Sequence, residues 1–170
     1  IQTLWISYAP ITGPAAKLYG TTDLGIGALA MIFMVAFVPL SIPASWVIDT
    51  KGFRFGVGIG ALLMAVFAPL RGLAGSSYAW VLVSTCGLAA AQPFFLNAWT
   101  KLPALWFPVR ERATAVGIVT LASLVGAGVG MALTPILTER AGMSIPTVQV
   151  VYGLGAVGGD PIILGTLDRT

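Results

Sequence analysis

Two long uncharged segments joined by a very short charged connection constrain this chain more than any other feature. No charged residue occurs from Leu24 to Ile48 or from Phe55 to Leu70, and only the six residues DTKGFR, Asp49 to Arg54, separate the two runs. An uncharged, mostly apolar run of about 18 residues is long enough to cross the hydrocarbon core of a membrane as a helix. The pattern therefore predicts two membrane spans joined by a tight turn that holds charge on one side of the bilayer.

The composition of the chain agrees with an integral membrane protein. Of the 170 residues, 57% are hydrophobic and 9% are charged, whereas a typical soluble domain carries roughly 25% charged residues. So few charges cannot cover the surface of a small soluble globule. With no histidine and one cysteine, Cys86, the chain offers no Cys/His zinc site and no disulfide framework, so no metal or cofactor is expected. The nine basic residues form no basic stripe, and nucleic acid is not an expected partner.

Six apolar segments predict an all-α, polytopic membrane helix bundle of about six spans. Helices are expected because every backbone amide in lipid needs a partner inside the protein. The segments are 1–16, 24–48, 55–70, 78–100, 113–137 and 144–159. The first holds Pro10 and opens on Ile1 rather than methionine, and the last is short for a crossing, so both are expected to be incomplete.

The end of the chain reads differently from the spans. Asp160-Pro161 is expected to end the last helix, because proline lacks a backbone N–H. We therefore predict a membrane domain over 1–159 and a short tail over 160–170, and we expect the chain to be a fragment of a longer protein.

Lys and Arg are unevenly divided between the two ends of the predicted spans. The loops 49–54 and 104–112 hold or adjoin five basic residues, and the opposite end holds three: Lys51, Arg54, Lys101, Arg110 and Arg112 against Lys17, Arg71 and Arg140. Short basic loops stay in the cytoplasm. We therefore place both loops in the cytoplasm, in a multi-pass protein of the plasma membrane or the bacterial inner membrane.

Glycine and proline positions predict how the spans pack. Gly56 and Gly60 are four residues apart, as are Gly126 and Gly130, and small residues at this spacing let helix backbones approach closely. Pro93, which follows Gln92 in the middle of a span, predicts a kink.

The connection DTKGFR resembles the loop signature G-x-x-x-D-R-x-G-R-R of the major facilitator superfamily, which lies between the second and third spans. Asp49, Gly52 and Arg54 match it. Glycine permits the tight turn, and Asp49 can face the positive N-terminus of another helix. In the family these contacts latch the cytoplasmic side in the outward-facing state, so the resemblance implies a conformational latch at these three residues. The signature's other positions are occupied here by Ser45, Thr50 and Phe53.

Further segments resemble one branch of that superfamily, named after the feline leukaemia virus subgroup C receptor. They are LWISYAPITGPAAKLYG, FVPLSIPASWVIDTKGFR and AAQPFFLNAWTKLPALWF. WFPVRERATA, with Arg110, Glu111 and Arg112, is similar to the cytoplasmic loop between spans four and five. The likeness covers most of 3–137 and implies the N-terminal six-helix half of a transporter, with a C-terminal six-helix half as its partner. Members carry heme-, choline- or ethanolamine-related transport assignments.

The resemblance also implies a substrate site. In that branch a tryptophan of the first span and a glutamine of the fourth line the central cavity, and Trp5 and Gln92 match them. An indole attracts an ammonium group by cation–π interaction worth up to about 2 kcal/mol, and glutamine offers hydrogen bonds without an intramembrane charge. Alternatively, Trp5 is an interfacial belt residue and Gln92 bonds a neighbouring helix. Tyr8 and Asn97 are further substrate-binding candidates.

The predicted function is a secondary-transporter half that moves a small organic solute by alternating access, with a choline- or ethanolamine-like cation as the candidate. The alternative is a small membrane interaction or assembly subunit without transport activity of its own. An enzyme is not expected, because the chain has no histidine and no paired acids within the bilayer. No acidic residue falls inside a span, which indicates either a uniporter or a carrier whose proton relay lies in the other half.

Overall fold

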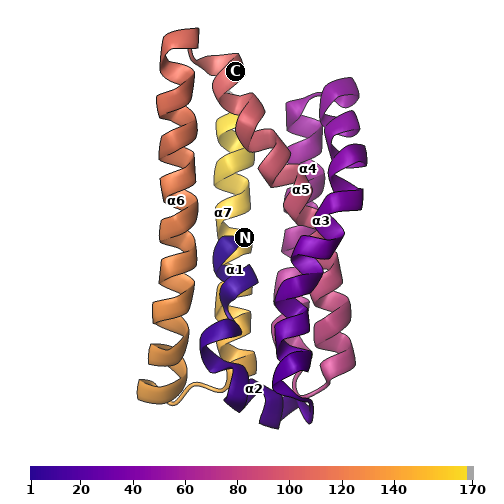
Figure 1. Cartoon of the computed structure of the whole chain (residues 1–170), viewed down its shortest axis with the longest axis vertical. Coiled ribbons are helices and arrows are strands. Elements are labelled where there is room, and N and C mark those ends of the chain that lie inside the picture. The colour runs from indigo at the N-terminus through magenta and orange to yellow at the C-terminus, as the bar shows by residue number, and fades with distance from the viewer. Residues whose placement is uncertain (168–170) are drawn as a thin grey trace.

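Helices stand side by side along the long axis of the molecule (Figure 1). The computed structural model describes residues 1–167, without the side chains at positions 100, 105 and 159–167. Within this described part, four helices are long and apolar enough to cross a membrane: α3 (Asp23–Lys51), α4 (Phe53–Leu73), α5 (Tyr78–Trp106) and α6 (Val109–Pro135). They correspond to the second to fifth predicted segments, and the predicted all-α membrane bundle is confirmed.

The first segment is broken into three pieces. These pieces are α1 (Gln2–Ile6), the 3-10 turn η1 (Ala9–Ile11) and α2 (Thr12–Tyr19). Pro10 lies in the 3-10 turn, where it has no N–H to offer a continuing helix. Gly20 then ends α2 in the left-handed conformation, with φ 60°, and its N–H bonds the carbonyl of Ala16.

The last helix, α7 (Ile145–Leu167), runs longer than expected. Its backbone continues through Asp160 and Pro161, so the expectation that this pair ends the helix is wrong. Proline removes one backbone hydrogen bond, and a helix of this length keeps its direction through the remaining ones. The division at residue 159 stays a prediction, and 168–170 lie outside the described residues. Between α6 and α7 lies the π-helical turn η2 (Ile136–Arg140).

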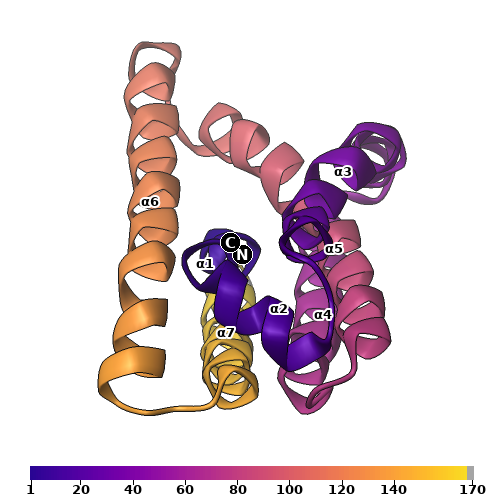
Figure 2. The same ribbon diagram turned by 60° about the horizontal axis from the view of Figure 1, so that its bottom comes forward.

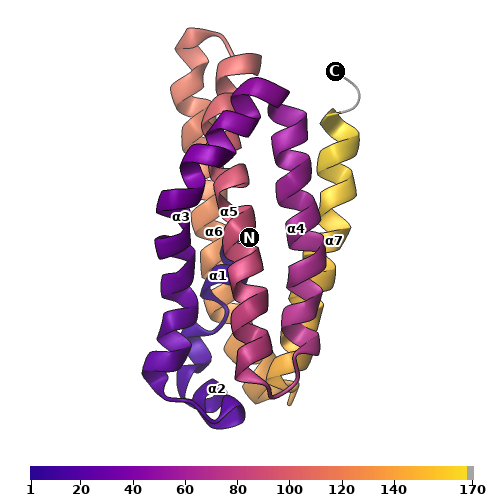
Figure 3. The same ribbon diagram turned by 90° about the vertical axis from the view of Figure 1, so that its right-hand side faces the viewer.

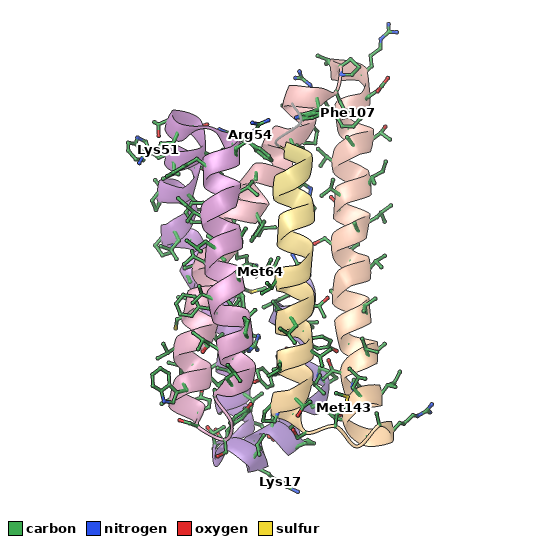
Figure 4. All side chains as sticks on the ribbon, turned by 180° about the vertical axis from the view of Figure 1, so that it is seen from behind. Lys17, Lys51, Arg54, Met64, Phe107 and Met143 are labelled. Atoms are coloured by element: carbon green, nitrogen blue, oxygen red, sulfur yellow. The ribbon has the colours of Figure 1, made fainter. Side chains whose placement is uncertain are left out.

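The two loops predicted to share one face of the membrane lie at the same end of the bundle. Lys51 and Arg54 in the first loop and Phe107 in the second stand at one end, and Lys17 and Met143 stand at the other (Figure 4). Figure 3 shows α3 rising to this end and α4 descending from it. The structure therefore supports a shared side for these loops, and cytoplasmic placement stays a prediction.

Arg71 differs from its expected place. Sequence reasoning counted it among the three basic residues at the end opposite DTKGFR, but it lies inside the last turn of α4 and is 1% exposed. Exposed basic residues at that end are then Lys17 and Arg140. The imbalance of basic loop residues between the two ends is larger than the sequence count indicated.

Helices α3, α4 and α5 form one group in the bundle, and α6 lies on the other side of α1 and α7 (Figure 2). Helix α4 packs against α5 and α7, α3 packs against α5, and α1 packs against α6. In the tilted view of Figure 2, α7 and α1 stand between α6 and the α3–α4–α5 group. The first span therefore lies where it contacts both α6 and the α3–α4–α5 group.

Gly60 and Gly130, one glycine of each predicted pair, lie where two helices approach closely, whereas a Cβ on Gly126 would make only ordinary contact, 3.7 Å from the Cβ of Gln2. A Cβ built on Gly60 would lie 3.0 Å from the Cβ of Phe94 on α5, and one on Gly130 would lie 3.1 Å from the Cα of Thr3 on α1. A further close contact was not predicted: a Cβ on Gly153 would lie 2.8 Å from the backbone nitrogen of Pro69. Helices α4 and α7 thus meet backbone to backbone. Helix α5 is continuous through Pro93, and a kink there stays a prediction.

We expect Gly153→Leu to destabilise the bundle, because its side chain would collide with the α4 backbone at Ala68 and Pro69. Overpacking of this kind costs about 1–3 kcal/mol. Gly155→Leu is the matched control, since a Cβ on Gly155 meets no atom within 4 Å. Thermal unfolding in detergent should show a lower midpoint for Gly153→Leu alone. Equal midpoints for the two variants would contradict the close α4–α7 contact.

Candidate functional site

Trp5 lies on α1 and its indole is anchored to the second span. The indole Nε1 donates a hydrogen bond of 3.3 Å to the carbonyl oxygen of Ala30 on α3. The half-buried ring packs against a core cluster that includes Phe33 of α3 and Leu88 and Ala89 of α5. The ring plane is therefore fixed between spans, at a place where part of it remains uncovered.

Gln92 lies on the same face of α5 as that cluster. Leu88 and Ala89 precede it by four and three residues, and residues at these spacings neighbour each other on a helix. Although the residue is half-buried, its Oε1 atom is buried and has no hydrogen-bond partner among the described residues. An unsatisfied buried acceptor costs about 1–3 kcal/mol. Trp5 thus packs against this cluster, Gln92 shares a helix face with two of its members, and Gln92 Oε1 has no donor among the described residues.

The other two predicted substrate-binding residues have partners inside the bundle. Asn97 on α5 donates from Nδ2 to the carbonyl oxygen of Ser41 on α3, at 3.0 Å. Tyr8 is 3% exposed, and its hydroxyl lies 2.9 Å from the Tyr19 hydroxyl. Both contacts tie spans or pieces of spans together. Whether either residue also meets a solute stays a prediction.

At the predicted latch, Asp49 forms an ion pair with Lys101 of α5. The side chains are 58% and 37% exposed, so the pair contributes less than about 1 kcal/mol. The sequence singled out the N-terminus of a helix as the partner of Asp49, whereas within this chain the carboxylate meets a lysine. Lys101 was noted only for its charge, because a contact between residues so far apart in sequence is invisible in a local pattern.

Gly52 and Arg54 complete the turn at this end. Gly52 alone separates α3 from α4 and has φ 93°, a conformation that L-residues with side chains rarely adopt. Arg54 lies in the first turn of α4 and, with Lys51, lines a groove of about 690 Å³. The apolar wall of this groove consists of Phe55, Gly58, Ile59 and Leu62.

The second loop at this end is held by Arg112. Its Nε donates to the carbonyl oxygen of Phe107 at 3.1 Å, and its terminal nitrogen donates to that of Ala104 at 2.9 Å. A cation on the last carbonyls of α5 is favourable because those groups carry partial negative charge. Glu111 lies in the first turn of α6, where a negative charge is favourable, and Arg110 is exposed beside it. Of the three predicted loop residues, Arg112 therefore fixes the loop.

A bundle of membrane-spanning helices with a one-glycine turn between its second and third spans and a largely uncharged interior is the architecture of a polytopic membrane protein. The family model of the Major Facilitator Superfamily matches residues 2–163, and the chain belongs to this superfamily. It is an integral multi-pass membrane protein of a transporter family.

The similar curated proteins come from the predicted branch. The chain is 33% identical over 138 residues to the choline/ethanolamine transporter FLVCR1 of Felis catus, covering 80% of this chain and 25% of that protein. It is 34% identical over 159 residues to solute carrier family 49 member A3 of Danio rerio, covering 89% and 33%. It is 25% identical over 138 residues to the choline/ethanolamine transporter FLVCR2 of Homo sapiens, covering 80% and 26%. The chain thus spans a quarter to a third of the length of these relatives.

The Asp49–Lys101 pair allows a charge-reversal test of the latch. In the complete transporter, Asp49→Lys should lower solute turnover about five-fold, because two cations would then face each other at the α3–α5 end. The double variant Asp49→Lys with Lys101→Asp restores the pair and should recover most of the turnover. Lys17→Glu, at the opposite end, is the charge-reversal control. Failure of the double variant to recover turnover would assign Asp49 to a different partner.

Proposed function

We propose that this chain is the N-terminal six-helix half of a secondary transporter that carries a small organic cation of the choline or ethanolamine type by alternating access. The observation that carries the proposal is the buried Oε1 of Gln92, which has no donor among the described residues and follows Leu88 and Ala89 on α5, two members of the cluster against which the Trp5 ring packs. The names of two relatives, choline/ethanolamine transporters, favour the same class of solute.

The two side chains suit the two ends of such a solute. A quaternary ammonium has no N–H to donate, so it is bound by a π face rather than by a carbonyl, and the Trp5 indole supplies that face. The hydroxyl of choline is a donor, and Gln92 Oε1 is an acceptor without one. A primary ammonium could donate to the same oxygen. This pairing needs no carboxylate, whose burial in the membrane would be costly.

The outer faces of two helices support a second half. Helices α3 and α6 expose many large apolar side chains, among them Met31, Met34, Val35, Val38 and Ile42 on α3, and Ile118, Leu121, Leu124, Val125 and Val129 on α6. Lipid or an apolar protein surface must cover them. We propose that part of this surface meets a C-terminal six-helix half, with the solute between the halves.

A weak latch is consistent with such a cycle. A contact that closes the cytoplasmic side must break and re-form in every turnover, so its free energy has to be small. The exposed pair at Asp49 meets this condition, and the rigid turn at Gly52 keeps Asp49 and Arg54 at fixed positions around it. We assign Asp49, Gly52 and Arg54 to the latch and place both loops at this end in the cytoplasm.

Trp5→Ala should raise the KM for radiolabelled choline about ten- to thirty-fold in the complete transporter, because it removes a desolvated cation–π contact. Trp5→Phe keeps an aromatic face and should fall between Trp5→Ala and the wild type. Trp80→Ala, which removes a 61% exposed tryptophan of α5, is the control. An unchanged KM in Trp5→Ala would argue against this site. No uptake by the complete protein would favour the alternative of an interaction or assembly subunit.

Gln92→Leu separates the two interpretations of this glutamine. If Gln92 serves the solute, the substitution removes an unsatisfied buried acceptor and should raise thermal stability by about 1 kcal/mol without solute, while choline uptake falls about ten-fold or more. If Gln92 instead ties neighbouring helices, stability should fall. Thermal unfolding in detergent, with and without choline, and uptake in vesicles measure both effects. Lower stability with normal uptake would contradict the proposed role.

A further inference from the structure

Arg71 is a buried cation that the proposed transport mechanism leaves unused. It is 1% exposed, and the ion pairs found among the described residues do not include it. We propose that Arg71 is a positioning residue that holds the broken first span so that Trp5 presents its ring to the solute. This inference rests on the proposed function, since it gives Arg71 a role in solute recognition.

The principal contact of Arg71 is with the end of α1. One terminal nitrogen of its guanidinium donates to the carbonyl oxygen of Leu4, at 2.6 Å. Helix α1 ends at Ile6, so the carbonyl of Leu4 has no partner four residues ahead within its own helix. Lipid offers no donor in place of water, and an unsatisfied carbonyl there would be costly. Arg71 therefore supplies from α4 the donor that the break in the first span removes.

The same side chain also contacts the residue that follows the break. Its guanidinium carbon lies 4.4 Å from the centre of the Tyr8 ring, whose hydroxyl pairs with that of Tyr19 on α2. A planar guanidinium can donate at its edge and stack on an aromatic face at once, which an ammonium cannot do. Arg71 thus joins the end of α1 to the ring beyond it.

A second set of contacts that holds the end of α1 comes from α7. The Ser7 hydroxyl donates to the Leu4 carbonyl at 3.0 Å, and Gln149 Nε2 donates to the Ser7 hydroxyl at 3.1 Å. Both Ser7 and Gln149 are fully buried. The carbonyl of Leu4 is therefore held from α4 directly and from α7 through Ser7.

The position of Trp5 depends on this carbonyl because it belongs to Leu4, the residue directly before Trp5. A helix of five residues is too short to keep its direction by its own hydrogen bonds. Its place is set by contacts with neighbours, namely the Arg71 bond, the bond from Trp5 to Ala30 and the bond from the Thr3 hydroxyl to Gly126 at 2.8 Å. Loss of the Arg71 bond frees the end of α1 that carries the indole.

A double-mutant cycle in the complete transporter tests this role. Arg71→Met should raise the KM for choline about ten-fold with a kcat within about two-fold of the wild type, because the loss falls on binding geometry. In a Trp5→Ala background the same substitution should raise KM less than about two-fold further, since the indole it positions is gone. Arg71→Lys keeps a hydrogen-bond donor but not the planar guanidinium that also stacks on Tyr8. Its KM should lie between those of Arg71→Met and the wild type. Arg140→Met removes an exposed cation and is the control.

Hydrogen–deuterium exchange supplies a readout that needs no solute. Backbone amides of residues 2–11 should exchange faster in Arg71→Met than in the wild type and be unchanged in Arg140→Met. If Arg71→Met does not accumulate, Arg71→Lys is measured in its place. Unchanged exchange over 2–11, or equal effects on KM with and without Trp5, would overturn the inference. Faster exchange in a protein that does not bind choline would instead refute the proposed function, while it would still support the role of Arg71 in holding the end of α1.

Discussion

The break in the first span is the constraint to which much of this bundle responds. Lipid cannot satisfy a backbone carbonyl, so a helix that stops at Ile6 must find donors for its last turn inside the protein. The donors come from α4 through Arg71 and from Ser7, which Gln149 of α7 holds in place. These contacts explain why Arg71, Ser7 and Gln149 are buried together in a largely apolar interior, and why α1 lies where it contacts several helices.

Close backbone contact fixes the helices that flank this break. At Gly153 and Pro69, α4 and α7 approach so closely that a single Cβ would not fit, which makes the pair a rigid support for the polar cluster. Helices α3 and α6 are different, because both expose large apolar side chains along their length. A rigid inner pair and two apolar outer faces are what a half-transporter needs if it moves as one body against a partner.

The proposed solute chemistry follows from the same shortage of buried charge. An interior that offers an indole face and a neutral amide acceptor suits a solute that carries its own positive charge, because binding it buries no carboxylate. The ion pair at Asp49 lies outside this interior, where solvent weakens it. The buried polar contacts thus hold the fold together, and the weaker ion pair lies at the end that would open in the proposed transport cycle.

The sequence by itself determined the main spans and the turn at Gly52, because hydropathy and backbone conformation depend on neighbours in the chain. It also determined the family, through the resemblance of its loop motifs. It also singled out Trp5 and Gln92, although only through resemblance. Tertiary structure decided the partner of each polar group. Arg71 was counted only among the basic residues at one end of the bundle, and Asp49 had no visible lysine partner, because both contacts are made with residues far away in the sequence. A hydrogen-bond partner is a property of packing, and only packing shows that Gln92 Oε1 has none among the described residues.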